Sequence, residues 1–197
     1  DYLRNSVIAY ATDGVYCESA SPTITNTVFR YNTDGIEADN GSQPNIYENT
    51  FLENTRPISI HSDDIRGGIY GNTYTDNTKN YIEVLGSDLR EHYSTTDYYW
   101  RNDGAPYVVT QGFRIDYNND TYNGVYNQND YERRSVLRIE SGTEIQFYED
   151  QILYIGNEPV TIWVNGIGNV ANYRHGALQA DSVTFTAFDN TALWGGL

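Results

Sequence analysis

The side chains best suited to hold a metal ion are acidic, and they fall into two groups. Glu37 and Asp39 alternate with apolar residues, so on an extended chain both point to one face. Asp116, Asn118 and Asp120 have the Asp-x-Asn-x-Asp spacing of a calcium-binding loop, although the sixth-position glycine and the closing glutamate are missing. Calcium is therefore the one ion considered, and nothing in the sequence requires a cofactor. A solvated acidic surface and a polar turn explain the same two groups without a metal.

Other reactive side chains do not form a recognisable catalytic set. His61, His92 and His175 are scattered and lack the paired spacing of a metal site. Cys17 is the only cysteine, which excludes an internal disulfide, and it is expected to be a small buried apolar side chain. The sequence has no Gly-x-Ser-x-Gly elbow, phosphate-binding loop or dinucleotide fingerprint.

Aromatic residues and two sequons point toward carbohydrate. The chain has 19 tyrosines and three tryptophans, whose rings could stack on sugars, although tyrosine also covers apolar faces while its hydroxyl contacts water. Asn40 and Asn119 begin Asn-x-Ser/Thr sequons in predicted turns, so both are candidate glycosylation sites. Cell-surface glycans are therefore considered as partners.

Composition limits the partners and the location of the protein. Acidic residues outnumber basic ones by 27 to 12, giving a formal net charge of −15, which repels nucleic acid. The longest apolar runs, such as residues 160–164, are strand-sized and far too short for a membrane span. Low lysine content, abundant tyrosine and strong acidity predict an extracellular protein. The absence of methionine suggests a processed product, a fragment or one unit of a longer protein.

A repeat in the first half must position these side chains. Four similar segments each follow an apolar anchor, and the anchors are spaced 21, 22 and 23 residues apart. These anchors are Leu3, Ile24, Ile46 and Ile69. The period is too short for paired helices, and apolar residues alternate two by two, which indicates strands with one buried face. Three short strands and three turns per coil predict an all-β fold, a right-handed parallel β-helix with about 21–23 residues per coil.

In such a solenoid, equivalent side chains stack in columns along the axis. Besides the anchors, the expected interior columns are Ile8/Phe29/Phe51/Tyr74, Val15/Ile36/Ile58 and Cys17/Ala38/Ile60. Asn26, Asn49 and Asn72 are expected to form a hydrogen-bonded ladder at one turn. Gly14 and Gly35 are expected to form tight bends before a strand.

The repeat stops near residue 86, and three regions follow from this. Residues 1–85 are predicted to be regular coils. Residues 86–135 hold many of the tyrosines and are predicted to be an irregular connecting segment. Strand patterns return in residues 136–197, which are predicted to form a second, less regular set of coils, packing as one unit or onto the next unit.

Two kinds of segment carry a family resemblance. Coils of the form Asn-x-x-Phe-x-x-Asn-x-x-Gly-Ile recur in the first half, preceded by Ser-Pro-Thr-Ile at residues 21–24. Residues 100–109, followed by the Leu-x-Ile-x-x-Gly-Thr-x-Ile-x-Phe run at residues 137–147, look like an opening segment. With these features the chain resembles the right-handed β-helix repeats of the pectate-lyase-like superfamily, which includes archaeal and bacterial surface proteins of the sheath and S-layer kind. The resemblance covers most of the chain but leaves its activity open, because members include lyases, hydrolases, adhesins and inert surface proteins.

The resemblance also implies where a catalytic site would lie. Polysaccharide lyases of this fold hold Ca²⁺ with a carboxylate cluster and use a nearby Arg or Lys as the base. The matching candidates are Glu37, Asp39, Asp63 and Asp64, with Arg56 or Arg66 as the base and His61 in the column of Asp39. No convincing acid–base set emerges from them, so we expect no catalytic residues.

The order of the segments suggests how the protein assembles. Regular coils come first and the opening segment comes last, as if a β-helix had been cut and the end of one solenoid joined to the start of the next. Open ends of this kind are expected to dock head to tail on further copies of the chain. The predicted interface consists of Leu3, Ile8, Val15, Val183, Phe185, Trp194 and Leu197.

The leading hypothesis is therefore a non-catalytic structural protein of an extracellular array, sheath or fibre. A Ca²⁺-dependent polysaccharide lyase or hydrolase is one alternative, and it would be favoured if Glu37, Asp39 and an arginine converged on one ion. A glycan-binding adhesin module is another, and it would be favoured by parallel exposed aromatic rings.

Overall fold

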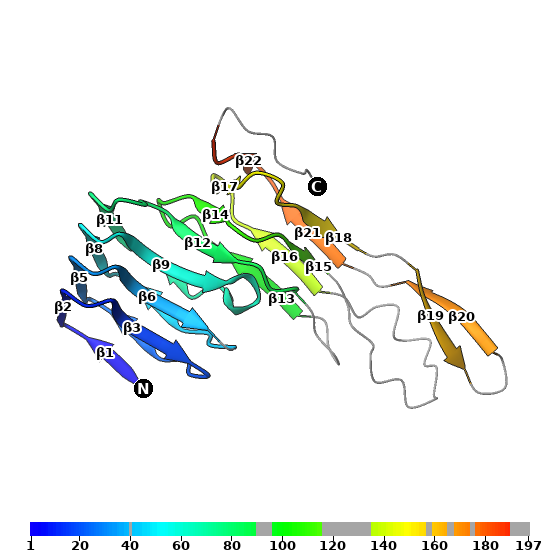
Figure 1. Cartoon of the computed structure of the whole chain (residues 1–197), viewed down its shortest axis with the longest axis horizontal. Helices are drawn as coiled ribbons and strands as arrows, with labels where there is room; N and C mark the ends of the chain where they lie inside the picture. The colour runs from blue at the N-terminus through cyan, green and yellow to red at the C-terminus, as the bar shows by residue number, and fades with distance from the viewer. Residues whose placement is uncertain are drawn as a thin grey trace.

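The computed structural model describes residues 1–39, 41–89, 96–115, 135–156, 159–164, 168–173 and 176–189. Within these residues, the regular structure is β-strand apart from the 3₁₀-helix η1 (Ser62–Asp64). Most strands pair in parallel with the equivalent strand of the next coil, so the chain winds into a stack of coils (Figure 1). The described part of the chain contains no helix of the length and apolarity needed to cross a membrane.

Three parallel sheets form the walls of the first four coils. The first sheet contains β1 (Tyr2–Arg4), β4 (Thr23–Thr25), β7 (Asn45–Tyr47) and β10 (Ile69–Tyr70). The second contains β2 (Val7–Ala9), β5 (Val28–Arg30), β8 (Thr50–Leu52) and β11 (Thr73–Thr75). The third, which we call the long sheet, contains β3 (Asp13–Glu18), β6 (Asp34–Asp39), β9 (Arg56–His61), β12 (Ile82–Leu85), β14 (Tyr107–Val109), β17 (Glu144–Phe147) and β22 (Thr184–Ala187).

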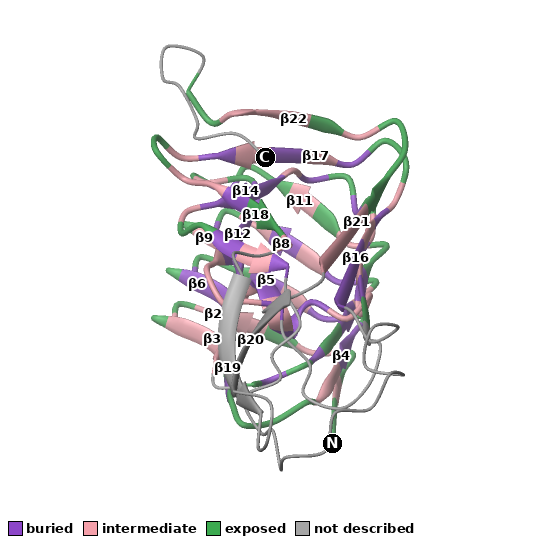
Figure 2. Ribbon diagram, turned by 90° about the vertical axis from the view of Figure 1, so that its right-hand side faces the viewer, coloured by how far each residue is buried: buried purple, intermediate pink, exposed green. Residues whose placement is uncertain are grey.

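The predicted interior columns are confirmed by the strand register. The paired residues are Leu3–Ile24–Ile46–Ile69, Ile8–Phe29–Phe51–Tyr74, Val15–Ile36–Ile58 and Cys17–Ala38–Ile60. Phe51 stacks on Phe29 and on Tyr74, with ring centroids 5.1 and 5.4 Å apart. Figure 2 shows the buried residues gathered along these strands, while the turns carry most of the exposed ones. The columns therefore form one continuous apolar core.

The predicted asparagine ladder is confirmed for Asn49 and Asn72 but not for Asn26. Asn26 is exposed and has a left-handed backbone (φ 49°), a position that Glu48 occupies in the next coil. The ladder instead joins Thr27, Asn49 and Asn72, because the N–H of Thr27 donates to Asn49 Oδ1 and that of Asn49 to Asn72 Oδ1. Equivalent positions in these two coils are 22 residues apart, as Thr27 and Asn49 are. Asn26 and Asn49 are 23 residues apart, so matching the two asparagines in the sequence pairs Asn26 with the wrong position.

A second ladder, which the sequence reasoning missed, occupies the next turn. Asn32, Asn54 and Asn77 are buried, and each backbone N–H of the first two donates to the side-chain oxygen of the next asparagine at 3.1 and 2.9 Å. Gly14 and Gly35 have a different role from the predicted bend. A Cβ at Gly14 would lie 2.5 Å from the Gly35 carbonyl oxygen, so glycine permits the close approach of successive coils.

The second half continues the same solenoid, which corrects two predictions. Residues 96–115, expected to be an irregular connection, contain β13 (Thr96–Trp100), β14 and β15 (Phe113–Ile115). The run at residues 137–147 does not open a new solenoid, because β17 pairs with β14 on one side and β22 on the other. β16 (Ser135–Ile139) likewise lies between β13 and β21 (Gly176–Ala180).

The remaining strands complete the chain. β15 pairs in parallel with β18 (Leu153–Ile155). β19 (Pro159–Val164) and β20 (Gly168–Tyr173) pair antiparallel with each other. Residues 160–162 were predicted to belong to a coil, and this prediction is wrong. This hairpin extends away from the stacked coils in Figure 1.

Candidate functional site

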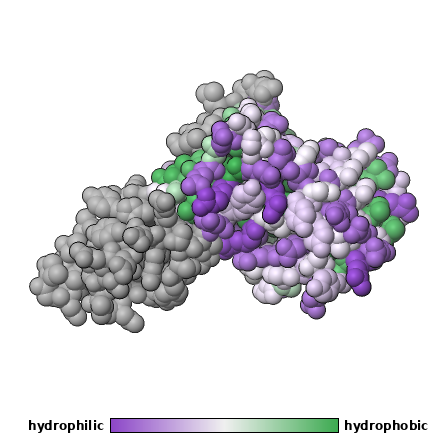
Figure 3. All heavy atoms as spheres, turned by 180° about the vertical axis from the view of Figure 1, so that it is seen from behind, coloured by the Kyte–Doolittle hydropathy of each residue, from purple (hydrophilic) through white to green (hydrophobic). Residues whose placement is uncertain are grey.

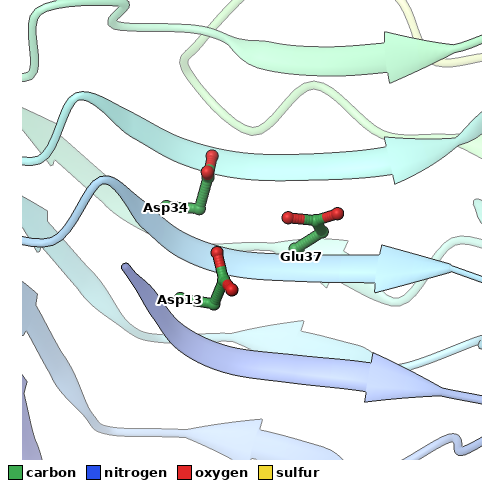
Figure 4. A group of neighbouring side chains, drawn as sticks. All are labelled: Asp13, Asp34 and Glu37. Atoms are coloured by element: carbon green, nitrogen blue, oxygen red, sulfur yellow. The ribbon is translucent and has the colours of Figure 1, made fainter. Parts of the chain in front are cut away.

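Three carboxylates gather on the outer face of the long sheet. Asp13 and Asp34 are neighbours on β3 and β6, and Glu37 lies on β6 beside them (Figure 4). One oxygen from each side chain lies within 4.8 Å of the others, and among the described residues this is the one such group of three potential metal ligands. Three carboxylate oxygens could supply part of the oxygen shell that Ca²⁺ requires.

One member of this carboxylate group is already paired with an arginine. Arg56, on β9, donates from Nε and Nη2 to the two oxygens of Asp34 at 2.5 and 2.7 Å. Its Nη1 contacts Glu83 on the next strand. These hydrogen bonds and charges raise the pKa of the Arg56 guanidinium, so Arg56 is held in its charged form and is unsuited to act as a base.

Glu37 carries an electrostatic cost in this position. Partial burial raises the pKa of its carboxyl, and the charges of Asp13 and Asp34 raise it further. Arg56 acts in the opposite direction, which lowers that pKa. Neutralising the group with a cation would relieve the repulsion among the three carboxylates.

The other predicted acidic candidates lie apart from this group. Asp39 is 3.1 Å from His61 Nε2, which confirms that the two share a column but places Asp39 outside the group of three carboxylates. Asp64 lies in η1 and is nearly inaccessible, and burial followed by the charge of Asp63 raises its carboxyl pKa to about 6. Arg66 lies over the ring of Tyr98, 4.0 Å from its centroid. Glu37, Asp39 and an arginine therefore do not converge on one point.

Cys17 is confirmed as a buried structural side chain. It is 2% exposed, and burial raises the pKa of its thiol to about 11. Such a thiol is protonated at neutral pH, which makes it a poor nucleophile.

The predicted assembly residues lie at opposite ends of the stack. Leu3, Ile8 and Val15 belong to the first coil and are only partly buried. Val183 and Phe185 are also partly buried, and Phe185 lies on β22, the last strand of the long sheet. In the described part of the chain, each end of the long sheet therefore has one unpaired edge.

Several predicted sites fall outside the described residues. These are Asp116, Asn118, Asp120, Trp194, Leu197, Asn40, Asn119, His92 and His175. Conversely, the sequence reasoning missed Asp13 and Asp34 as partners of Glu37. Both precede a glycine at the same position of the repeat, 21 residues apart, so the period itself held the signal.

Comparison with known proteins identifies the fold independently. The profile of the family described as "Right handed beta helix region" matches residues 2–152 of the 197. No curated protein and no solved structure gives a match.

Proposed function

Since the chain belongs to the right-handed β-helix family, we propose that it is a non-catalytic structural protein of an extracellular surface array, sheath or fibre. In this proposal, copies stack end to end and the solenoid continues from one copy into the next. The partners are further copies of the chain, and no cofactor is required.

The burial of the end columns carries this proposal. Leu3, Ile8 and Val15 are partly exposed, whereas the residues that follow them in the same columns, Ile24, Phe29 and Ile36, are 0% exposed. At the other end, Phe185 is partly exposed while its neighbour Ile145 is 1% exposed. Another coil placed on either end would bury these apolar side chains as the internal coils bury theirs.

The backbone of the first coil supports the same conclusion. In a parallel strand, successive N–H groups point to opposite sides. Tyr10 donates its N–H to Arg30 O on β5, at 3.4 Å, so within β2 the N–H groups of Val7 and Ala9 face the open edge. A strand from a second copy could accept hydrogen bonds from both.

Acidity would keep such stacks apart from one another. The net charge of −15 makes the sides of neighbouring stacks repel. Ca²⁺ bound by Asp13, Asp34 and Glu37 could reduce this repulsion and bridge stacks laterally, which would be its role in an array.

Sedimentation velocity over a range of concentrations tests the assembly. The chain should form species larger than a monomer, and Val7→Pro should reduce them because proline removes an N–H at the open edge. Val7→Ala is the matched control, since it keeps the N–H and should assemble normally. A chain that remains monomeric at high concentration, or equal assembly by both variants, would contradict end-to-end stacking through β2.

The enzyme alternative makes an opposite prediction. A lyase would release unsaturated sugars from acidic polysaccharides, and these products absorb ultraviolet light. Because Arg56 is held by Asp34 and Glu83, we expect no release with or without Ca²⁺. Product formation that Asp39→Asn or Glu37→Gln abolishes would favour the lyase over the structural role.

A further inference from the structure

A cavity of about 390 Å³ lies on the outer surface of the later coils, beside β15 and β18. Its lining comes from these two strands and from three connecting segments, and its polar members are Asp88, Arg114, Asp150, Gln151 and Tyr154. This volume falls within the usual range of small-molecule sites. The cavity shares no residue with the apolar columns at the two ends of the long sheet or with the three carboxylates on that sheet.

The stacking of coils holds the cavity in shape. Arg114 pairs with Tyr154 in the register of β15 and β18, and the Arg114 N–H donates to Asp88 Oδ1 at 2.9 Å. The N–H of Gly112 donates to Gln151 Oε1 at 2.6 Å. A Cβ at Gly112 would lie 2.7 Å from the Ile152 carbonyl oxygen, so the close packing of these two lining residues requires glycine at position 112. Two of the polar side chains, Asp88 and Gln151, are therefore held by backbone N–H groups before any ligand arrives.

The lining combines an aromatic ring with both hydrogen-bond donors and acceptors. Tyr154 is 47% exposed, and the Arg114 guanidinium lies 5.1 Å from its ring centroid. Arg114 can only donate, whereas the ionised carboxylates of Asp88 and Asp150 can only accept. A hydroxyl group both donates and accepts, so a ligand with several hydroxyls could add hydrogen bonds to both kinds of group.

Charge narrows the ligand class further. An anion would meet two carboxylates on a chain of net charge −15, and a metal cation would meet the guanidinium of Arg114. A neutral ligand meets neither cost. A sugar ring also carries a face of C–H groups that can lie against an aromatic ring such as that of Tyr154.

We propose that this cavity binds a neutral oligosaccharide, with Tyr154 under one sugar ring and Arg114, Asp88 and Asp150 hydrogen-bonded to its hydroxyls. The proposal does not depend on end-to-end assembly. A structural protein with such a site would attach its array to a neutral glycan.

Isothermal titration calorimetry of the full chain tests the proposal. The probes are cellotetraose, maltotetraose, chitotetraose, tetragalacturonate and CaCl₂. At least one neutral tetrasaccharide should bind with a Kd in the millimolar range or tighter, and its affinity should not change with added salt. Tyr154→Ala should weaken that binding at least about tenfold. Tyr31→Ala is the control, because Tyr31 is similarly exposed and lies outside the cavity.

Asp150→Asn separates the ligand classes. It should change the affinity for the neutral sugar only a few-fold, because the amide oxygen still accepts a hydrogen bond. Binding of none of the three neutral sugars overturns the proposal, as does tighter binding of tetragalacturonate. Ca²⁺ binding that Asp150→Asn abolishes overturns it as well.

Hydrogen exchange measured on the unmodified chain provides a test that does not depend on variant folding. The bound sugar should slow exchange in a peptide covering residues 111–115. Slowed exchange confined to other regions would place the ligand elsewhere and overturn the proposed site.

Discussion

Phe51 is enclosed on both faces by aromatic rings inside the solenoid. It is 0% exposed, and its ring lies nearly parallel to those of Phe29 and Tyr74, at interplanar angles of 12° and 8°. Phe51→Ala should therefore lower the free energy of unfolding by about 3–5 kcal/mol, because it leaves a cavity in the column. Urea unfolding measures this, and Val7→Ala, at an exposed position, should change it by less than about 0.5 kcal/mol. A loss below about 1 kcal/mol for Phe51→Ala would contradict the column.

Asp64 makes the stability depend on pH. Burial raises its carboxyl pKa from the ordinary value of 3.8 to about 6 in the folded chain, and its Oδ2 atom has no hydrogen-bond partner among the described residues. A raised carboxyl pKa favours the protonated form in the fold. The resulting stabilisation is fully present below about pH 4 and is lost as the pH rises through about 6.

Asp64→Asn should therefore stabilise the protein at neutral pH by about 1–3 kcal/mol, since the amide cannot ionise. At pH 3.5 the variant and the original chain should be nearly equal. Urea unfolding across this pH range measures the difference, with Asp76→Asn at an exposed turn as the control. An equal stability difference at every pH would show that ionisation of Asp64 is not the cause.

At the scale of elements, the turns depend on the buried asparagine ladder of residues 32, 54 and 77. Asn54 accepts from Asn32 N–H and donates to Phe29 O and Asn77 Oδ1, at 3.0–3.1 Å. Asn54→Ala leaves these partners unsatisfied in the interior, so it should cost about 2–4 kcal/mol of unfolding free energy in urea titrations. The control is Asn26→Gly, which changes an exposed asparagine with a left-handed backbone and should be nearly neutral. Equal effects of the two substitutions would contradict this role of the ladder.

An element could be predicted from the sequence where its residues recur at regular spacing, and could not be where only composition was available. The columns of the first half could be predicted because Phe29 and Phe51 recur at matching positions with alternating neighbours. In the turn ladder, Asn49 and Asn72 were predicted correctly, but Asn26 was not, because the equivalent of Asn49 in the preceding coil lies 22 residues earlier, at Thr27. Tyr98 and Tyr107 are fully buried in strands, yet tyrosine in a polar sequence also suits an exposed loop, so composition alone could not place them.

The candidate site was only partly predictable, because its residues contact one another across coils and are far apart in the sequence. Alternation on β6 correctly predicted that Glu37 points outward. Its neighbours Asp13 and Asp34 are found by stacking one coil on another, which the repeat period encodes. The bond between Arg56 and Asp34 depends on side-chain reach across strands, and no local pattern indicates it.

At the scale of the whole molecule, the long sheet joins the two halves into one solenoid. An inward-facing column runs from Val15 at one end to Phe185 at the other, through Ile36, Ile58, Ile82, Tyr107 and Ile145. Among the described residues, this sheet has one unpaired edge at β3 and another at β22, and all of its strands run in the same direction. The two edges are therefore complementary to each other, and head-to-tail stacking is the contact that continues the sheet.

This geometry fixes the register of the proposed junction between copies. A second inward-facing column begins at Cys17 and ends at Ala187. If β22 of one copy pairs with β3 of the next and Phe185 follows the column of Val15, then Ala187 lies beside Cys17. Neighbouring strands are about 4.8 Å apart, which is within the Cα separation that a disulfide spans.

Ala187→Cys should therefore form intermolecular disulfides with Cys17 when the assembled protein is oxidised at alkaline pH, which is needed because burial raises the pKa of the Cys17 thiol to about 11. The product should be a ladder of covalent multimers on a non-reducing gel, which a reductant collapses to the single chain. Within one chain, Cys17 and position 187 lie at opposite ends of the long sheet, so an internal bond cannot form. Thr186→Cys is the matched control, since alternation points its side chain to the other face, and it should give little ladder. Assembly that persists without cross-linking of Ala187→Cys would show a different register, whereas a monomer without cross-links would contradict assembly itself.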